Sequence, residues 1–266
     1  MHTSISYKIS DFIFSIIIGT LIEFLRYAVV ILFSPLFFIC ALITYARIKN
    51  DNAIVNSEKE QTKDKKDKEK PRVVDGFRLL IENKPFLITT ITGAVINFFF
   101  SGFAIYILLF ANYHDSPLLL GIANSVVAFG AFLGSILLVK YVFKNIGLGK
   151  KYCLGTIGFG IGLTVASFFT DTWHFIIILG IASLFLGSNH VTATPIFQTL
   201  ADKKHFGKIM SASYTLSIGS MPLGALFFGI FTQNISIQMF FIAFGCVYII
   251  IGLIYYFTKP IREIVL

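Results

Sequence analysis

Residues Gly187–Phe231 read GSNHVTATPIFQTLADKKHFGKIMSASYTLSIGSMPLGALFFGIF, and they set the fold class of this chain. A first apolar run ends in PIFQTLAD, a short loop carries three lysines, and a second apolar run contains PLGALFFG. Each run approaches the length of about 20 residues that crosses a ~30 Å hydrocarbon core as a helix. Two such runs around a basic loop predict two membrane-spanning helices that are joined at one membrane face.

The composition extends this prediction to the whole chain. Of its 266 residues, 56% are hydrophobic and 14% are charged, and the mean hydropathy is +0.79. A soluble domain of this length would need more polar surface. The predicted fold class is therefore an all-α polytopic membrane protein with about eight transmembrane helices. The three cysteines lie in apolar stretches without CxxC spacing, so neither a metal site nor a disulfide framework is predicted.

The last six predicted spans are the clearest, and they are expected to form one bundle. They cover Pro85–Phe110, Leu118–Val139, Tyr152–Phe169, Trp173–Pro195, Ile209–Phe231 and Ile235–Phe257. A longer apolar stretch, Phe12–Tyr45, precedes them and is interrupted by Glu23 and Arg26. We interpret this stretch as two short crossings, Ile9–Leu25 and Tyr27–Tyr45. The alternative is a single crossing, Tyr27–Tyr45, preceded by a helix at the membrane interface.

Three segments follow from this pattern: a transmembrane hairpin over residues 1–46, a charged linker over 47–84 and a six-helix bundle over 85–266. The linker contains EKEQTKDKKDKEKPR at Glu58–Arg72, where Lys alternates closely with Asp and Glu. Such mixed charge predicts a solvated linker. Gly76–Phe86, which reads GFRLLIENKPF, predicts a short amphipathic helix that leads into the span beginning at Pro85.

The distribution of Lys and Arg predicts the topology. Of the 22 basic residues, eleven lie between Arg47 and Lys84, and most others fall in alternate connections between the last six spans. The intervening connections, Ala111–Pro117, Thr170–Thr172 and Thr232–Ser236, contain none. Because cytoplasmic loops are rich in Lys and Arg, both termini are predicted to be cytoplasmic in a multi-pass inner or plasma membrane protein. The net charge of +8 is thus a topology signal, and no nucleic-acid partner is predicted.

Polar residues inside the last six spans are few and uncharged, since no Asp, Glu, Lys or Arg lies in the middle of any of them. The candidate substrate-cavity residues are Asn97, Asn124, Asn189 and His190. Interhelical hydrogen bonding is the alternative role for the asparagines. His190 is the one side chain among these that titrates near neutral pH, and a structural role is the alternative to proton transfer.

Catalytic motifs are missing from the sequence, which has no HExxH, Walker or GxSxG pattern. The chain is therefore not expected to be an enzyme, and no catalytic residue, metal ligand or cofactor is predicted. Glycines are the other clear signal: Gly130 and Gly134 share one span, and four more crowd the next. Small residues at such spacing let membrane helices approach closely, so a tightly packed bundle is predicted.

The stretch Gly187–Phe231 also carries a family resemblance. It resembles the tenth and eleventh helices of the major facilitator superfamily, especially the macrolide-efflux and siderophore-exporter-like branch. The family pattern runs from Q through a short loop to G-R/K, then S, and later P-L-G-x-x-x-x-G. The matching residues are Gln198, Gly207, Lys208, Ser211, Pro222, Gly224 and Gly229. The resemblance implies a gating or cytoplasmic-loop role for Gln198, Gly207, Lys208, Pro222 and Gly224.

The resemblance continues along the chain in order. Pro85–Phe257 is similar to helices seven to twelve of such a transporter, and Ile9–Tyr45 to helices five and six, which implies an N-terminally truncated member. The link Lys144–Lys151 departs from the family, because it lacks the acidic residue often found there. Full members have two six-helix halves with the substrate bound between them near the midplane.

The function that the resemblance implies is that of a complete or partial permease for the secondary-active efflux of small molecules or drugs by alternating access. The implied partners are the lipid bilayer, a small-molecule substrate, and a separately encoded N-terminal half or a second copy of the chain. The alternative is a non-transporting membrane scaffold or regulator, or an inactive transporter fragment.

Overall fold

The computed structural model describes residues 73–169, 171–201 and 205–265. Over these ranges the secondary structure is helical, without strands. The predicted hairpin over residues 1–46, with its two crossings, and the charged stretch Glu58–Arg72 lie outside the described residues. The amphipathic helix predicted over Gly76–Phe86 falls inside them and is present as α3, which runs over Val73–Glu82; Lys84–Phe86 already belong to the next helix.

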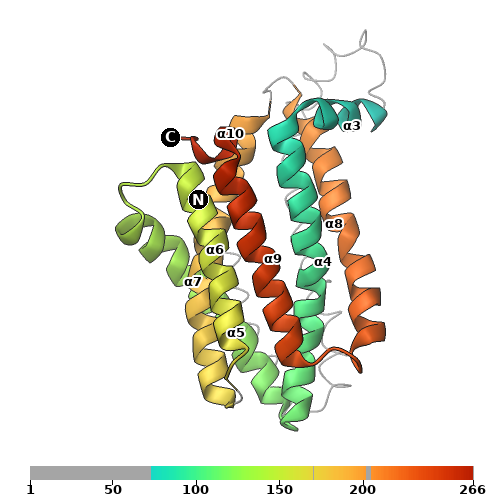
Figure 1. The fold of residues 1–266 in the computed structure, drawn as a ribbon, viewed down its shortest axis with the longest axis vertical. Helices are drawn as coiled ribbons and strands as arrows, with labels where there is room; N and C mark the ends of the chain where they lie inside the picture. The colour runs from blue at the N-terminus through green and yellow to red at the C-terminus, as the bar shows by residue number, and fades with distance from the viewer. Residues whose placement is uncertain (1–72, 170, 202–204, 266) are drawn as a thin grey trace, which may run out of the picture.

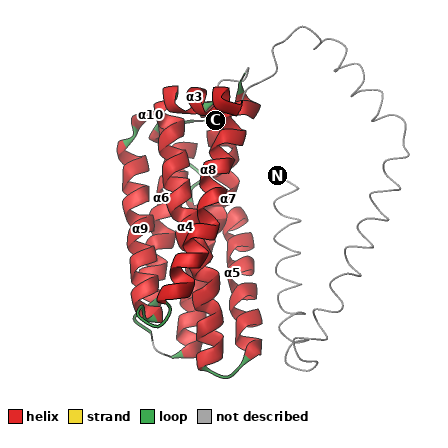
Figure 2. Ribbon diagram, turned by 90° about the vertical axis from the view of Figure 1, so that its right-hand side faces the viewer, coloured by secondary structure: helices red, strands yellow, loops and turns green. Residues whose placement is uncertain are grey.

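The described part of the chain contains six long helices, and they run side by side along a common direction (Figures 1 and 2). They are α4 (Lys84–Tyr113), α5 (Pro117–Leu137), α6 (Leu148–Ala166), α7 (Thr172–Leu200), α8 (Phe206–Phe231) and α9 (Ile237–Phe257). A π-helical turn, η1 (Leu138–Val142), extends α5, and a short α10 (Lys259–Arg262) follows α9. Helix α3 lies across one end of α4 and α8, and α10 lies at the same end (Figure 1). We call this end the α3 end.

Five of these helices are long and apolar enough to cross a membrane: α4, α5 with η1, α7, α8 and α9. Helix α6 is also part of the bundle, but its first turn contains Lys150 and Lys151 and it includes five glycines, which lowers its hydropathy. The all-helical membrane class is thus supported, while the count of spans stays a prediction.

Several predicted helix ends differ from the structure by three to five residues. Helix α6 runs over Leu148–Ala166 rather than Tyr152–Phe169, α7 continues through Pro195 to Leu200, and α8 begins at Phe206 rather than at Ile209. Proline removes one backbone donor, but neighbouring helices and local adjustments compensate for this in membrane helices, so the helix does not end there. The starts of three helices are fixed by side-chain caps. The side-chain oxygens of Asn83, Asp171 and Ser236 accept hydrogen bonds from the first backbone amides of α4, α7 and α9.

Close packing at glycine, predicted from the sequence, is confirmed in the helix pairs α5–α7 and α6–α9. Gly130 and Gly134 of α5 lie directly against the backbone of α7. Gly160 of α6 lies against α9, where an added Cβ would be 2.6 Å from the Gly245 carbonyl oxygen. Lipid gives no hydrophobic drive for helix association, so such close van der Waals contact is a main source of bundle stability. Stacked rings add to it between α4 and α9, for example Tyr106 and Phe240 with centroids 4.2 Å apart.

Candidate functional site

The asparagines predicted for a substrate cavity occupy different environments. Asn189 is buried between α6 and α7, where its Nδ2 donates a hydrogen bond of 3.2 Å to Thr156 Oγ1. A substrate reaches this side chain only if the two helices separate. Asn124 is exposed on α5, and its Nδ2 donates to the Leu120 carbonyl of the same helix at 3.0 Å. Its side chain is therefore accessible from outside the bundle.

One face of α7 carries exposed polar side chains at a spacing of four residues. His190, Thr194 and Gln198 are all exposed, although they belong to a helix that is apolar enough to span a membrane. Residues four apart lie above one another on a helix surface, so the three form one row, which we call the α7 stripe. Polar groups that face lipid are costly, and in membrane helices they usually face a water-filled cavity or a polar partner. The α7 stripe is accordingly a candidate surface for a hydrated pathway or for a polar partner.

A second polar feature joins α4 to α8. Asn97 Nδ2 donates to the Ser217 carbonyl oxygen at 3.0 Å, and Ser217 Oγ donates to the Thr90 carbonyl oxygen at 3.1 Å. Ser213 Oγ lies 2.8 Å from Thr90 Oγ1. Asn97 is thus placed at a helix–helix contact, as in the alternative considered for the asparagines.

Ser220 extends this contact toward the middle of α8. Its Oγ is 2.7 Å from the Ala94 carbonyl oxygen of α4 and 2.7 Å from the Ser217 carbonyl oxygen of its own helix. A hydroxyl has one proton, so it donates fully to only one of these acceptors at a time. We call the row formed by Thr90, Asn97, Ser213, Ser217 and Ser220 the α4–α8 seam.

The residues implicated in gating by the family resemblance lie along α7 and α8. Lys208 Nζ is 3.7 Å from Asp75 Oδ2 of α3, and Gly76 of α3 packs directly on the Lys208 carbonyl oxygen. Gly207 has open space where a side chain would be. Gly224 is buried against the backbone of α4, whereas Pro222 is exposed inside α8. Pro222 leaves α8 without one internal hydrogen bond close to the seam.

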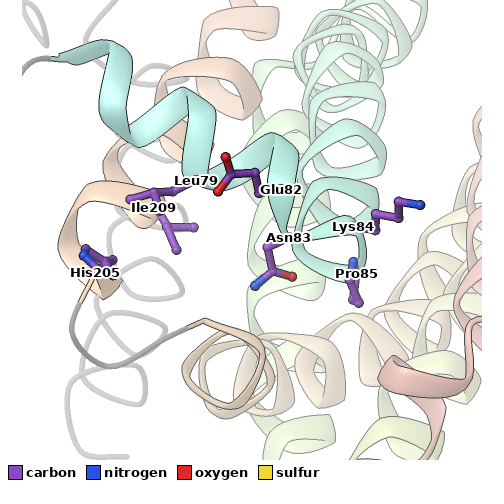
Figure 3. A pocket seen from close by; sticks show the side chains of 7 residues that line it. All are labelled: Leu79, Glu82, Asn83, Lys84, Pro85, His205 and Ile209. Carbon is purple, nitrogen blue, oxygen red and sulfur yellow. The ribbon is translucent and has the colours of Figure 1, made fainter.

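The turn between α3 and α4, which we call the elbow, lies at the ends of α7 and α8. Asn83 forms this elbow, and its Nδ2 donates to the Leu200 carbonyl oxygen of α7 at 2.7 Å. Beside it is an open pocket of about 510 Å³. Figure 3 shows His205 and Ile209 on one side of this pocket and Asn83, Lys84 and Pro85 across from them. The elbow, with the Lys208–Asp75 pair, forms a connection that we call the α3 latch.

The C-terminal segment, which contains Glu263, packs at the link between α5 and α6. The Gly149 amide donates to the Ile264 carbonyl oxygen at 3.0 Å, which fixes the segment after α10 against the start of α6. The pKa of the Glu263 carboxyl is lowered, chiefly by a hydrogen bond from Arg262 and also by the charge of Lys150. An ionised acid therefore lies near the link, although the link sequence itself contains none.

Sequence reasoning missed Asp75, Asn83 and the pairing within the α4–α8 seam. The serines at 213, 217 and 220 follow helical spacing on α8, and this signal would have predicted a single polar face. Asp75 and Asn83 gave no comparable signal, because their partners lie more than a hundred residues away in the chain.

The bundle of long helices, its glycine contacts and its apolar spans are those of a polytopic α-helical membrane protein. The sequence profile described as Major Facilitator Superfamily matches residues 95–265, and the chain belongs to this family. Members of the family are membrane transporters, which agrees with the class expected from Gly187–Phe231. Comparison with curated proteins and with solved structures gives no match.

Proposed function

We propose that this chain acts in the secondary-active export of small molecules, with residues 85–266 forming one wall of an alternating-access pathway. The observation that carries the proposal is the α7 stripe. Three polar side chains on the exposed face of a spanning helix are unfavourable against lipid and favourable beside a hydrated substrate pathway. Asn124, exposed on α5, is the fourth residue that we assign to this wall.

Helix α8 is the element best suited to move against the rest of the bundle. Only 11% of the residues in its most apolar 18-residue stretch are buried. In the described part of the chain, its main packing partners are α4 and α3. The bonds of the α4–α8 seam are individually weak, since interhelical hydrogen bonds in membranes average about 0.6 kcal/mol. Ser220 has two acceptors at equal distance, so a small shift of α8 exchanges one bond for the other without leaving the hydroxyl unpaired.

The α3 latch would hold one end of the pathway closed. Lys208 and Asp75 are both about half exposed, so their attraction is worth roughly 0.2–1 kcal/mol. A contact of this strength opens readily, yet it biases the position of α8 relative to α3. Gly207 and Pro222 of α8 belong to the same moving region in this proposal, whereas Gln198 belongs to the α7 stripe.

The opposite wall of the pathway lies outside the described residues in this proposal. A separately encoded N-terminal half or a second copy of the chain are the two partners that the superfamily's two-half architecture suggests. The efflux direction, the small-molecule substrate class and a cytoplasmic position for both termini are part of the same proposal.

A non-transporting membrane scaffold or regulator is the second candidate function. One observation favours it: no Asp, Glu, Lys or Arg lies in the middle of the last six predicted spans. Such groups commonly form the ion pathway of coupled transporters. Under this reading, the chain binds a membrane partner through α8 and moves no substrate.

The test is dye accumulation in cells that express the chain alone or together with a separately expressed N-terminal half. We expect His190→Leu and Gln198→Leu to change the accumulation of exported dyes, because both remove polar groups from the α7 stripe. Ile181→Leu is the matched control, since it alters an exposed apolar side chain of the same helix that is 54% exposed. Equal accumulation in all three variants and in cells without the chain would favour the scaffold function.

A further inference from the structure

A second pocket lies at the end of the bundle away from α3. Its volume is about 360 Å³, and it is formed by the ends of α4 and α6 and the starts of α7 and α9. Small-molecule sites in proteins typically measure about 300–1,000 Å³. The lining includes five aromatic rings from four parts of the chain: Phe110, Tyr113, Phe169, Phe175 and Phe241.

The rings divide into a packed inner wall and an accessible rim. Phe110, Phe175 and Phe241 are buried, and their centroids are 4.7 Å apart for Phe110–Phe175 and 5.1 Å apart for Phe175–Phe241. Tyr113 is 80% exposed and Phe169 is 40% exposed. The inner rings are thus fixed by packing before any ligand arrives, while the rim rings reach solvent.

The polar atoms near the pocket are mostly engaged within the protein. The His114 ring lies edge-on to Phe110 at 5.0 Å, and its Nε2 is 3.2 Å from Thr172 Oγ1 at the start of α7. Ser167 Oγ donates to the Thr164 carbonyl oxygen at 2.6 Å. The exposed Gln238 side chain also lines the pocket, so the accessible recognition groups are the rim rings of Tyr113 and Phe169 together with this amide.

The charges around this end favour a cation. Asp115 follows His114 directly, and Asp171 lies two residues after Phe169. The Asp171 carboxylate also accepts a hydrogen bond of 2.7 Å from His174 Nδ1. The connections at this end, residues 111–117, 170–172 and 232–236, contain no Lys or Arg. The acidic side chains next to the pocket residues in sequence are therefore Asp115 and Asp171, and Asp171 is paired with His174.

We propose that this pocket binds an organic cation, an ammonium group that carries an apolar ring or chain. The faces of aromatic rings attract cations, and the attraction is strongest where water is excluded. A small inorganic cation would fit poorly, because no carboxylate of the described residues lines the pocket and the rings cannot replace its hydration shell. The proposal goes beyond the transport function, since the site is built within one bundle and binding requires no pathway.

The experiment titrates benzyltrimethylammonium into the purified full chain in detergent and follows tryptophan fluorescence. The chain has one tryptophan, Trp173, which is 58% exposed and lies two residues before Phe175. Neopentylbenzene, the neutral analogue of the same shape, is titrated in parallel. We expect a saturable change with the cation and binding at least about fivefold weaker with the neutral compound.

Removal of the rim rings tests the site itself. Tyr113→Leu combined with Phe169→Leu should weaken cation binding by about 5- to 30-fold, because each exposed ring contributes a few-fold in affinity. The matched control is Tyr141→Leu with Phe257→Leu, which removes two exposed rings at the α3 end and should leave the affinity unchanged.

Removal of charge gives an independent test that preserves the fold. Asp171→Asn retains an N-cap residue, and Asp115→Asn suits the positive φ of 49° at this position. Both substitutions should weaken the binding of the cation and leave the binding of the neutral compound unchanged. The proposal is overturned if the cation gives no saturable signal, if the neutral compound binds equally well, or if the rim double variant binds as the parent does. None of these outcomes bears on transport, because no flux is measured.

Discussion

Gly134→Ala is the substitution that tests the packing of this bundle most severely. Gly134 of α5 faces the backbone of α7 at Leu184, and an added Cβ would lie 2.5 Å from Leu184 Cα and closer still to its carbonyl group. Ordinary van der Waals contact begins at 3.4 Å. The two helices must therefore separate by at least 0.9 Å at this point, the difference between these two distances.

The expected cost follows from the size of this displacement. Overpacking a close contact costs about 1–3 kcal/mol, and here it is offset by the higher helix propensity of Ala, worth up to about 1 kcal/mol. The full offset leaves a net destabilisation of up to about 2 kcal/mol. The matched control is Gly219→Ala in α8, where the added Cβ meets nothing within 4 Å. This control should be neutral or slightly stabilising.

The assay is the loss of the monodisperse peak in size-exclusion chromatography after heating in detergent. Gly134→Ala should lose this peak at a lower temperature than the parent chain, and Gly219→Ala should not. Equal thermal stability of the two variants would refute the inferred α5–α7 contact.

Three further predictions concern other parts of the bundle. Asn97→Ala removes one hydrogen bond of the α4–α8 seam and should lower stability by about 0.6 kcal/mol, measured by the same heating assay. Asn124→Ala loses only a bond within its own helix, so it should leave thermal stability unchanged but alter dye accumulation; unchanged accumulation would remove Asn124 from the proposed wall. The pKa of Asp171 is lowered, chiefly by the hydrogen bond from the His174 side chain. A depressed carboxyl pKa stabilises the folded state above the unfolded pKa of about 3.9 and loses this effect as the pH falls through the folded pKa. When the pH is lowered from neutral to below about pH 4, the heating assay should therefore show a smaller decrease in thermal stability for Asp171→Asn than for the parent chain.

The helices of the bundle were predictable because length and hydropathy are local properties of the sequence. Gly130 and Gly134 likewise predicted a close helix contact, since a pair of small residues four apart has one main use in a membrane helix. The helix ends were less predictable. Pro195 suggested an end to α7, whereas tertiary packing carries the helix on to Leu200.

The candidate site was only partly predictable, because side-chain orientation depends on how the helices are rotated about their axes. Asn97, Asn124 and Asn189 have the same chemistry, yet one lies in a helix seam, one is exposed and one is buried. Lys208 was singled out through the family pattern, but its partner Asp75 was not, because an ion pair between distant segments leaves no mark on either one.

Export is tested most directly by the accumulation of a cationic fluorescent dye such as ethidium in cells without other major exporters. The cells would express the chain alone or together with a separately expressed N-terminal half. We expect lower dye accumulation in at least one of these two lines than in cells without the chain, and a loss of this difference when a protonophore collapses the ion gradient. Equal accumulation across all lines, with the chain present in the membrane, would contradict the proposed export function.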